Sequence, residues 1–196
     1  MRRLLRLIWR GLRRGRFVGT IAAMHSARLS YAPVTLGDAG GFHRIACDEH
    51  VRRYLLDGVV VSMEWSAQRI DESQASFARR GVGLWLAHER SSNELVGFCG
   101  FIELPSIHVE PQLVYALFER FTGTGYATEM ARASICHACT RARFRDVFAS
   151  VDAANVASRR VLEKLGFEPI AGNQGTFGAT SLLRLDATEG AHDRCA

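Results

Sequence analysis

The chain has 196 residues, of which 47% are hydrophobic, 9% aromatic and 23% charged, and its formal net charge is +5. This length suits about one globular domain, and the apolar fraction is too high for a disordered protein. No uninterrupted apolar run of about 18 residues occurs and no sequence period persists. We therefore expect neither a transmembrane segment nor a repeat or coiled-coil protein.

The positive charge is concentrated at the N-terminus. Residues 1–23 contain seven arginines and no acidic residue, which leaves 18 basic against 20 acidic residues in the rest of the chain. A body with this balance lacks the basic surface that nucleic-acid-binding proteins need, so we expect no nucleic-acid partner.

Residues 1–27 are interpreted as a basic extension ahead of the folded domain. Its arginines alternate with five apolar residues, Leu4, Leu5, Leu7, Ile8 and Trp9. This amphipathic pattern allows weak peripheral membrane contact by residues 1–23. Two alternatives remain open: an export signal around Arg13–Arg16, and translation that starts at Met24.

The five cysteines are odd in number and lack the spacing of a disulfide framework, which favours a reducing, cytoplasmic location. Cys136 and Cys139 form a C-x-x-C, an element of some zinc and redox sites. Because no second Cys/His pair has zinc-ligand spacing and the segment has a helical pattern, we expect no metal.

The first half of the chain predicts one strand, three helices and two antiparallel strands. The strand covers Arg28–Val34, and a capping box at Thr35–Asp38 opens the first helix. The other elements are a short helix over His50–Leu56, a helix capped by Ser66 and closed by Gly81, and strands over Leu84–His88 and Leu95–Ile102.

The second half alternates strands with helices. The expected elements are a strand over Leu113–Leu117, a helix from Tyr126 to about Arg141, a strand over Asp146–Val151, a helix over Val156–Leu165 and a strand over Ala179–Leu185. This order predicts a mixed sheet covered by helices in one α/β domain, residues 28–186, followed by a flexible tail, residues 187–196.

The strand Leu113–Leu117 leads through Phe118 into a glycine-containing loop, which opens directly onto a helix. The first turn of a helix presents free backbone N–H groups and a partial positive charge, and Gly123 and Gly125 allow a ligand to approach closely. These features favour a phosphate cradle, with an ordinary strand–loop–helix turn as the alternative. A Rossmann site would need glycine where Thr128 stands, and the Walker G-K-[ST] is missing.

A second polar cluster lies at the start of the helix Val156–Leu165. Asn155 is placed as its N-cap and Ser158 near the same end, while Gly166 is placed as its C-cap.

These two segments together resemble the GNAT superfamily of acetyl-CoA-dependent N-acetyltransferases. The loop pattern Q/R-x-x-G-x-G/A is matched by Arg120-Phe-Thr-Gly-Thr-Gly125, followed by the Tyr-Ala-Thr-Glu129 typical of the RimJ/RimL-type branch. The N-x-x-S pattern is matched by Asn155 and Ser158, and E-K-x-G-F by Glu163–Phe167. The resemblance runs from about Arg28 to Leu185.

The resemblance implies a GNAT fold whose mostly antiparallel central sheet splays into a V, and an amine that attacks the thioester of acetyl-CoA directly. The acceptor is a primary amine, on a protein N-terminus or a small molecule, and the enzyme is a monomer or homodimer. The implied contacts with acetyl-CoA are Leu117, Phe118, Arg120, Thr122, Gly123, Thr124, Gly125, Tyr126, Ala127, Asn155 and Ser158.

The catalytic residues depart from the family pattern. Leu162 stands where many members have a tyrosine that protonates the leaving thiolate, so Ser158 is the expected donor. Gln112 stands where the branch often has glutamate, so Glu103 is the expected general base, with His108 as a second candidate. The alternative is a non-catalytic acyl-CoA-binding or regulatory module.

Overall fold

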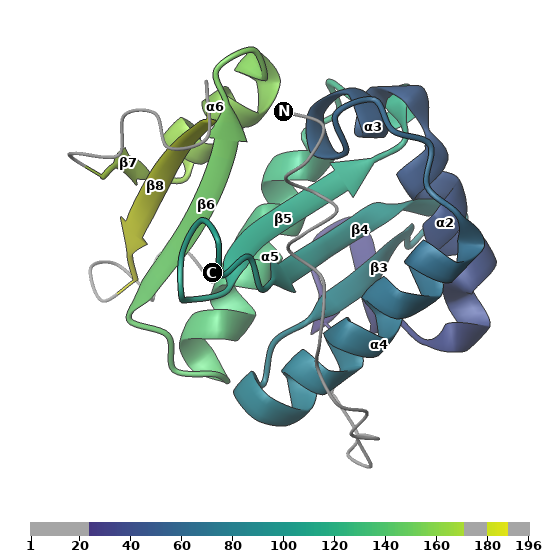
Figure 1. Ribbon diagram of the computed structural model, residues 1–196, viewed down its shortest axis with the longest axis horizontal. Helices are drawn as coiled ribbons and strands as arrows, with labels where there is room; N and C mark the ends of the chain where they lie inside the picture. Colours follow the sequence, from purple (N-terminus) through teal and green to yellow (C-terminus); the bar gives the residue numbers. More distant parts are fainter. Residues whose placement is uncertain (1–23, 171–179, 188–196) are drawn as a thin grey trace.

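The computed structural model describes residues 24–170 and 180–187, so residues 1–23 and residues 188–196 of the expected tail lie outside the described part. Within that part, eight strands form one sheet in the order β1-β2-β3-β4-β5-β6-β8-β7 (Figure 1). The strands are β1 Met24–His25, β2 Leu29–Pro33, β3 Leu84–Glu89, β4 Leu95–Ile102, β5 Gln112–Leu117, β6 Asp146–Asp152, β7 Glu168–Pro169 and β8 Thr180–Asp186.

The helices follow the predicted order along the chain. They are α2 Ala39–Cys47, α3 Glu49–Leu55, α4 Met63–Arg80, α5 Tyr126–Thr140 and α6 Val156–Lys164, with short 3-10 turns η1 Leu36–Asp38 and η2 Glu119–Phe121. Helices α2 and α4 lie on one side of the sheet and α5 on the other (Figure 1).

Helix α4 and the strands β1 and β7 differ from the sequence prediction, and the 3-10 turns η1 and η2 were not predicted as separate elements. The two-residue strands β1 and β7 were not predicted, because a segment that short shows no alternation. Helix α4 begins four residues earlier than expected: the Ser62 side chain accepts a hydrogen bond from the Trp65 N–H at 3.2 Å and caps the helix. The expected cap, Ser66, lies inside α4, fully buried, within 3.0 Å of the His43 ring.

Strand alternation divides the core between the two faces of the sheet. Leu84 and Leu86 of β3 pack with Phe42 and Ile70 from α2 and α4. Trp85, between them, points to the opposite face and packs in a cluster with residues of α5. Both faces of the central strands are therefore buried, which explains their nearly continuous apolar sequences.

The sheet opens between β5 and β6. These parallel strands pair only at Gln112 and Phe148, whereas β6 and β8 remain paired along seven positions, Asp146–Asp152. Figure 1 shows β5 and β6 diverging beyond this point. The edge of β5 that faces β6 is thus left without a strand partner from Leu113 onward, as the predicted V-shaped splay requires.

On the other side of β5, the backbone of β4 approaches very closely. A Cβ atom on Gly97 would lie 2.1 Å from the carbonyl oxygen of Ala116 in β5. Real Cβ atoms do not approach so near, so glycine at this position permits the observed spacing of the two strands.

In the described part of the chain, none of the helices combines the length and apolar character needed to cross a membrane.

Candidate active site

The splayed strands enclose a cavity of about 690 Å³. It is lined by β5 residues 113–117, by the loop and first turn of α5, by residues 149–152 of β6, and by α3 and α6. Eight of the expected ligand-binding residues meet here, namely Leu117, Thr122, Gly123, Gly125, Tyr126, Ala127, Asn155 and Ser158.

The loop between β5 and α5 has the features of an anion-binding turn. Gly125 is the N-cap of α5 with φ of 87°, in the left-handed region that favours glycine. Among the described residues, the backbone N–H groups of Gly123, Gly125, Ala127 and Thr128 find no hydrogen-bond acceptor. A Cβ on Gly123 would have nothing within 4 Å, so the space in front of the loop is open. These N–H groups, with the positive end of α5, fit a diphosphate.

Helix α6 supplies two polar side chains to the opposite wall. The Asn155 side chain accepts a hydrogen bond from the Ser158 N–H at 3.0 Å and caps the helix, as predicted. This cap fixes the first turn of α6, and therefore the position of the Ser158 hydroxyl, at the edge of the cavity.

Tyr115 of β5 reaches across the cleft to Ser158. Its hydroxyl lies 2.8 Å from Ser158 Oγ and 3.2 Å from the Ser158 carbonyl oxygen. Burial raises the pKa of Tyr115 to about 12, so the phenol keeps its proton at neutral pH. Tyr115 was not among the site residues predicted from the sequence. The available signal was its alternation with Leu113 and Leu117, which places all three on one face of β5.

Comparison with known proteins identifies the family. The Acetyltransferase (GNAT) domain matches residues 28–168, most of the chain. This chain belongs to the GNAT acetyltransferase family. Its predicted fold, a mixed sheet with a V-shaped opening, is confirmed by the topology and by solved GNAT structures.

The individual relatives are similar in fold and distant in sequence. A crystal structure of an acetyltransferase from Agrobacterium tumefaciens has a TM-score of 0.73 at 19% identity, covering 88% of this chain and 98% of that one. RimL, a ribosomal L7/L12 α-N-protein acetyltransferase in complex with coenzyme A, has a TM-score of 0.67 at 18% identity, covering 84% and 98%. The uncharacterized protein YkkB of Bacillus subtilis is 37% identical over 90 residues, 44% of this chain; the match spans about half of YkkB (51%).

GNAT acetyltransferases use acetyl-CoA, and three of the residues expected to contact it lie outside the cavity lining: Phe118, Arg120 and Thr124. The Arg120 guanidinium binds Glu94 at 2.7 Å and lies over the rings of Phe118 and Phe121. The Thr124 hydroxyl donates to the Phe121 carbonyl oxygen at 2.7 Å. In this arrangement the three residues make contacts within the loop and with Glu94, outside the cavity lining.

The expected base, Glu103, is placed differently from the other candidates. Its carboxylate is 3.1 Å from Arg79 and 3.4 Å from Arg80 at the end of α4, and it is not among the described residues that line the cavity. His108 stacks on Phe148 with ring centroids 3.9 Å apart, and it too is not part of the lining. Both base assignments therefore stay predictions: in this structure Glu103 is paired with two arginines and His108 is stacked on Phe148.

Helix α3 and the turn after it form the remaining wall. His50 and Tyr54 line the cavity with their rings in a T-shaped contact at 5.4 Å, and Asp57 follows at the end of the helix. Leu104 and Ile107 add apolar surface from the loop before β5. This wall therefore offers an imidazole, a phenol and a carboxylate to a second substrate.

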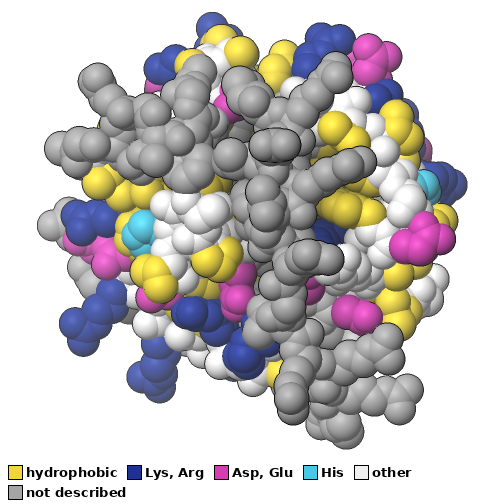
Figure 2. Space-filling model, in the orientation of Figure 1, with side chains coloured by type: hydrophobic (Ala, Val, Ile, Leu, Met, Phe, Trp, Pro, Cys, Tyr) yellow, Lys and Arg dark blue, Asp and Glu magenta, His cyan; other side chains and the backbone are white. Residues whose placement is uncertain are grey.

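Charges of both signs are interspersed over the described part of the face in Figure 2. This distribution agrees with a body of nearly balanced charge. Among the described residues, no three His, Cys, Asp or Glu side chains are grouped as metal ligands would be.

Proposed function

We propose that this chain is an N-acetyltransferase that moves the acetyl group of acetyl-CoA to a primary amine. One observation carries the proposal: the unpaired edge of β5 leads straight to the free N–H groups of the α5 loop, and the Tyr115–Ser158 pair faces that edge. The alternative, a binding or regulatory module without chemistry, would need the loop but not the Tyr115–Ser158 pair.

The residues around the cleft fit acetyl-CoA as a bound co-substrate, which supplies a reactive thioester. The N–H groups of residues 123–128 would hold its diphosphate. The backbone of Leu113–Leu117 would bind its amide-containing arm as an added strand. Closely held reactants gain much of their rate from proximity alone, so the site needs few catalytic groups.

The Tyr115–Ser158 pair is suited to stabilise the negative charge on a departing thiolate. When the Tyr115 hydroxyl donates to Ser158 Oγ, the serine's own hydrogen is free to point into the cleft. It can then donate a hydrogen bond to the sulfur as negative charge develops there. Burial raises the pKa of Tyr115 to about 12, so at neutral pH the phenol keeps the hydrogen that this orientation requires.

The acceptor is proposed to be an α-amine, as on a protein N-terminus, or a small amine of similarly low pKa. Deprotonation at pH 7 costs roughly 1.4 kcal/mol for an amine of pKa near 8 and roughly 4.6 kcal/mol for a lysine amine. The titratable side chains that line the described cavity wall on the α3 side are His50 and Asp57, with Tyr54 between them. A site with these groups favours the amine whose deprotonation at pH 7 costs less free energy. The fold similarity to RimL, an α-N-protein acetyltransferase, is consistent with this class.

The test combines calorimetry with a thiol-release assay. Acetyl-CoA should bind without metal and be turned over with peptides that have a free N-terminus. Gly125→Trp should abolish binding, because a side chain at this positive φ would strain the loop and its Cβ would lie 3.5 Å from Arg28 Nη2. Gly81→Trp is the matched control, since Gly81 has a similar φ of 72° but closes α4 away from the cavity. Absence of binding by the parent protein would refute the proposal. Binding without turnover of any amine would favour the regulatory module.

A further inference from the structure

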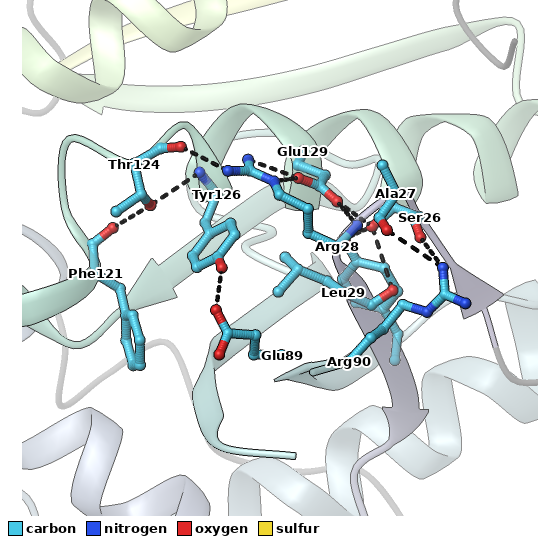
Figure 3. A network of polar contacts seen from close by, with 11 residues as sticks. Ser26, Ala27, Arg28, Leu29, Glu89, Arg90, Phe121, Thr124, Tyr126 and Glu129 are labelled. Atoms are coloured by element: carbon cyan, nitrogen blue, oxygen red, sulfur yellow. Dashed lines mark hydrogen bonds and ion pairs between the residues drawn. The ribbon is translucent and has the colours of Figure 1, made fainter. Parts of the chain in front are cut away.

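The loop in front of α5 is held from behind by a segment about 100 positions earlier in the chain (Figure 3). Glu129, in the first turn of α5, accepts hydrogen bonds at Oε1 from the Arg28 N–H at 2.8 Å and the Ser26 hydroxyl at 2.7 Å. The Nε and Nη2 atoms of Arg28 both lie 2.8 Å from its Oε2 atom. The carboxylate is thus surrounded by four donors.

Arg28 also contacts the loop itself. Its Nη1 atom donates to the Thr124 carbonyl oxygen at 3.0 Å, and its guanidinium lies over the Tyr126 ring at 4.4 Å. In a trans peptide, the carbonyl and the following N–H point in opposite directions. A Thr124 carbonyl turned toward Arg28 therefore directs the Gly125 N–H away from it. Gly125 lines the cavity, so this orientation leaves its N–H available there.

A second tether acts on the same turn. The Tyr126 hydroxyl donates to Glu89 at the end of β3, and the Ser92 hydroxyl donates to the other oxygen of that carboxylate at 2.7 Å. Arg90, beside it, donates to the carbonyl oxygens of Ser26 and Ala27 at 3.2 and 3.3 Å. Figure 3 shows Arg28, Glu89 and Arg90 on one side of the α5 N-terminus.

The charges in this network stay fixed near neutral pH. Burial acts to raise the pKa of Glu129, but hydrogen bonds from Ser26 and Arg28 outweigh it and lower that pKa below its usual value. The hydrogen bond from Tyr126 lowers the pKa of Glu89 in the same way. An acidic residue at a helix N-terminus would compete with a phosphate, and the Arg28 guanidinium, with two nitrogens on Oε2, neutralises that charge.

We propose that Arg28 and Glu129 are positioning residues that hold the α5 loop in the conformation that binds the diphosphate of the acyl donor. The inference rests on the proposed use of acetyl-CoA. It explains why the Tyr-Ala-Thr-Glu run follows the glycines here: Tyr126 and Glu129 each join the loop to a different part of the sheet. The pair acts through the loop backbone and not through the thioester.

The test compares two acetyl donors as substrates of the Glu129→Gln variant. Acetyl-CoA contains the diphosphate, whereas S-acetylpantetheine contains the thioester and the amide arm without it. We expect KM for acetyl-CoA to rise about tenfold, the size of effect typical of a lost charge-assisted contact, with kcat nearly unchanged. kcat/KM for S-acetylpantetheine should stay within about twofold of the parent protein.

Two further variants separate this effect from a general loss of structure. Asp146→Asn likewise removes one carboxylate charge, from the Arg184–Asp146 ion pair, which joins β8 and β6 at 3.6 Å. This control should leave the kinetic constants for both acetyl donors unchanged. Arg28→Lys keeps the charge but loses the two-pronged contact, and should show the same donor-selective loss as Glu129→Gln.

The outcomes distinguish the inference from the proposed function. A parent protein that binds acetyl-CoA, with both variants equal to it, would overturn the positioning role and leave the proposed function standing. An equal loss with both donors would also overturn it, because the damage would then not pass through the diphosphate. A parent protein that does not bind acetyl-CoA would overturn both.

Discussion

Replacing Ser158 and Tyr115, singly and together, tests whether the phenol acts through the serine. Ser158→Ala removes the hydroxyl proposed to face the departing sulfur, and Tyr115→Phe removes only the group that orients this hydroxyl. The two oxygens lie 2.8 Å apart, so the substitutions concern one direct contact.

The structure allows the size of each effect to be estimated. A hydrogen bond to a charged group contributes about 1.5–3 kcal/mol, which corresponds to a fall in kcat of about ten- to a hundredfold for Ser158→Ala. A neutral hydrogen bond contributes about 0.5–1.5 kcal/mol, so Tyr115→Phe should lower kcat about two- to tenfold. In Ser158→Ala the phenol can still donate to the carbonyl oxygen of residue 158, now 3.2 Å away. The free energy of unfolding should therefore fall by no more than about 1 kcal/mol.

The assay measures kcat and KM for acetyl-CoA by thiol release, and stability by urea unfolding, for the parent and three variants. KM should change little, and the double variant should be no slower than Ser158→Ala, because the two groups work in series. Ser30→Ala on β2, whose hydroxyl contacts only the His88 carbonyl oxygen at 3.4 Å among the described residues, is the control. Additive losses in the double variant, or an unchanged kcat in Ser158→Ala, would contradict this prediction.

Two other predictions concern stability and the start of the domain. Burial, opposed only in part by Arg69, raises the pKa of Glu72 from 4.5 to about 7, so the folded protein holds a proton that the unfolded chain releases. This contribution to stability is present below pH 4.5 and is lost as the pH rises to about 7. The free energy of unfolding of the parent minus that of Glu72→Gln should therefore decrease from about pH 5 to pH 8. An equal difference at the two pH values would contradict this prediction. A chain that begins at Met24 should match the full chain in Tm and kcat, because β1 and the Ser26–Arg28 contacts are kept. A chain that begins at Leu29 should show a raised KM for acetyl-CoA, and equal KM values for the two shortened chains would be the contrary result.

Local signals in the sequence were sufficient for the elements that form the proposed donor site. The apolar run ending at Leu117, the glycines of the loop and the cap at Asn155 each involve neighbours within a few residues, so the pattern determines both the element and its end. The start of α4 was predicted wrongly because the local pattern there allows two answers. Ser62 and Ser66 are both suitable caps, and the apolar positions Ile70 and Phe77 do not distinguish between them.

Contacts between distant segments could not be predicted in this way. Glu103 ends a strand, as a catalytic carboxylate can, but arginines more than 20 positions earlier occupy it. The Arg28–Glu129 contact joins residues 101 positions apart, and it depends on α5 packing against the face of the sheet that contains β2. Tyr115 reaches Ser158 only because β5 and β6 separate, a property of the whole sheet and not of either strand.

The close approach at Gly97 bears on how variants of this protein should be interpreted. This residue lies one strand away from the cavity wall, yet any side chain at position 97 would push against the Ala116 carbonyl oxygen and move the strand along which the donor is proposed to lie. In a saturation mutagenesis screen scored on activity, position 97 would therefore appear as intolerant as the loop glycines. A reader of such a map would mistake it for a substrate contact. Measuring the melting temperature and the activity of Gly97→Ala together would distinguish the two causes. A fall in both would indicate that β5 has been displaced, and not that a contact with the ligand has been lost.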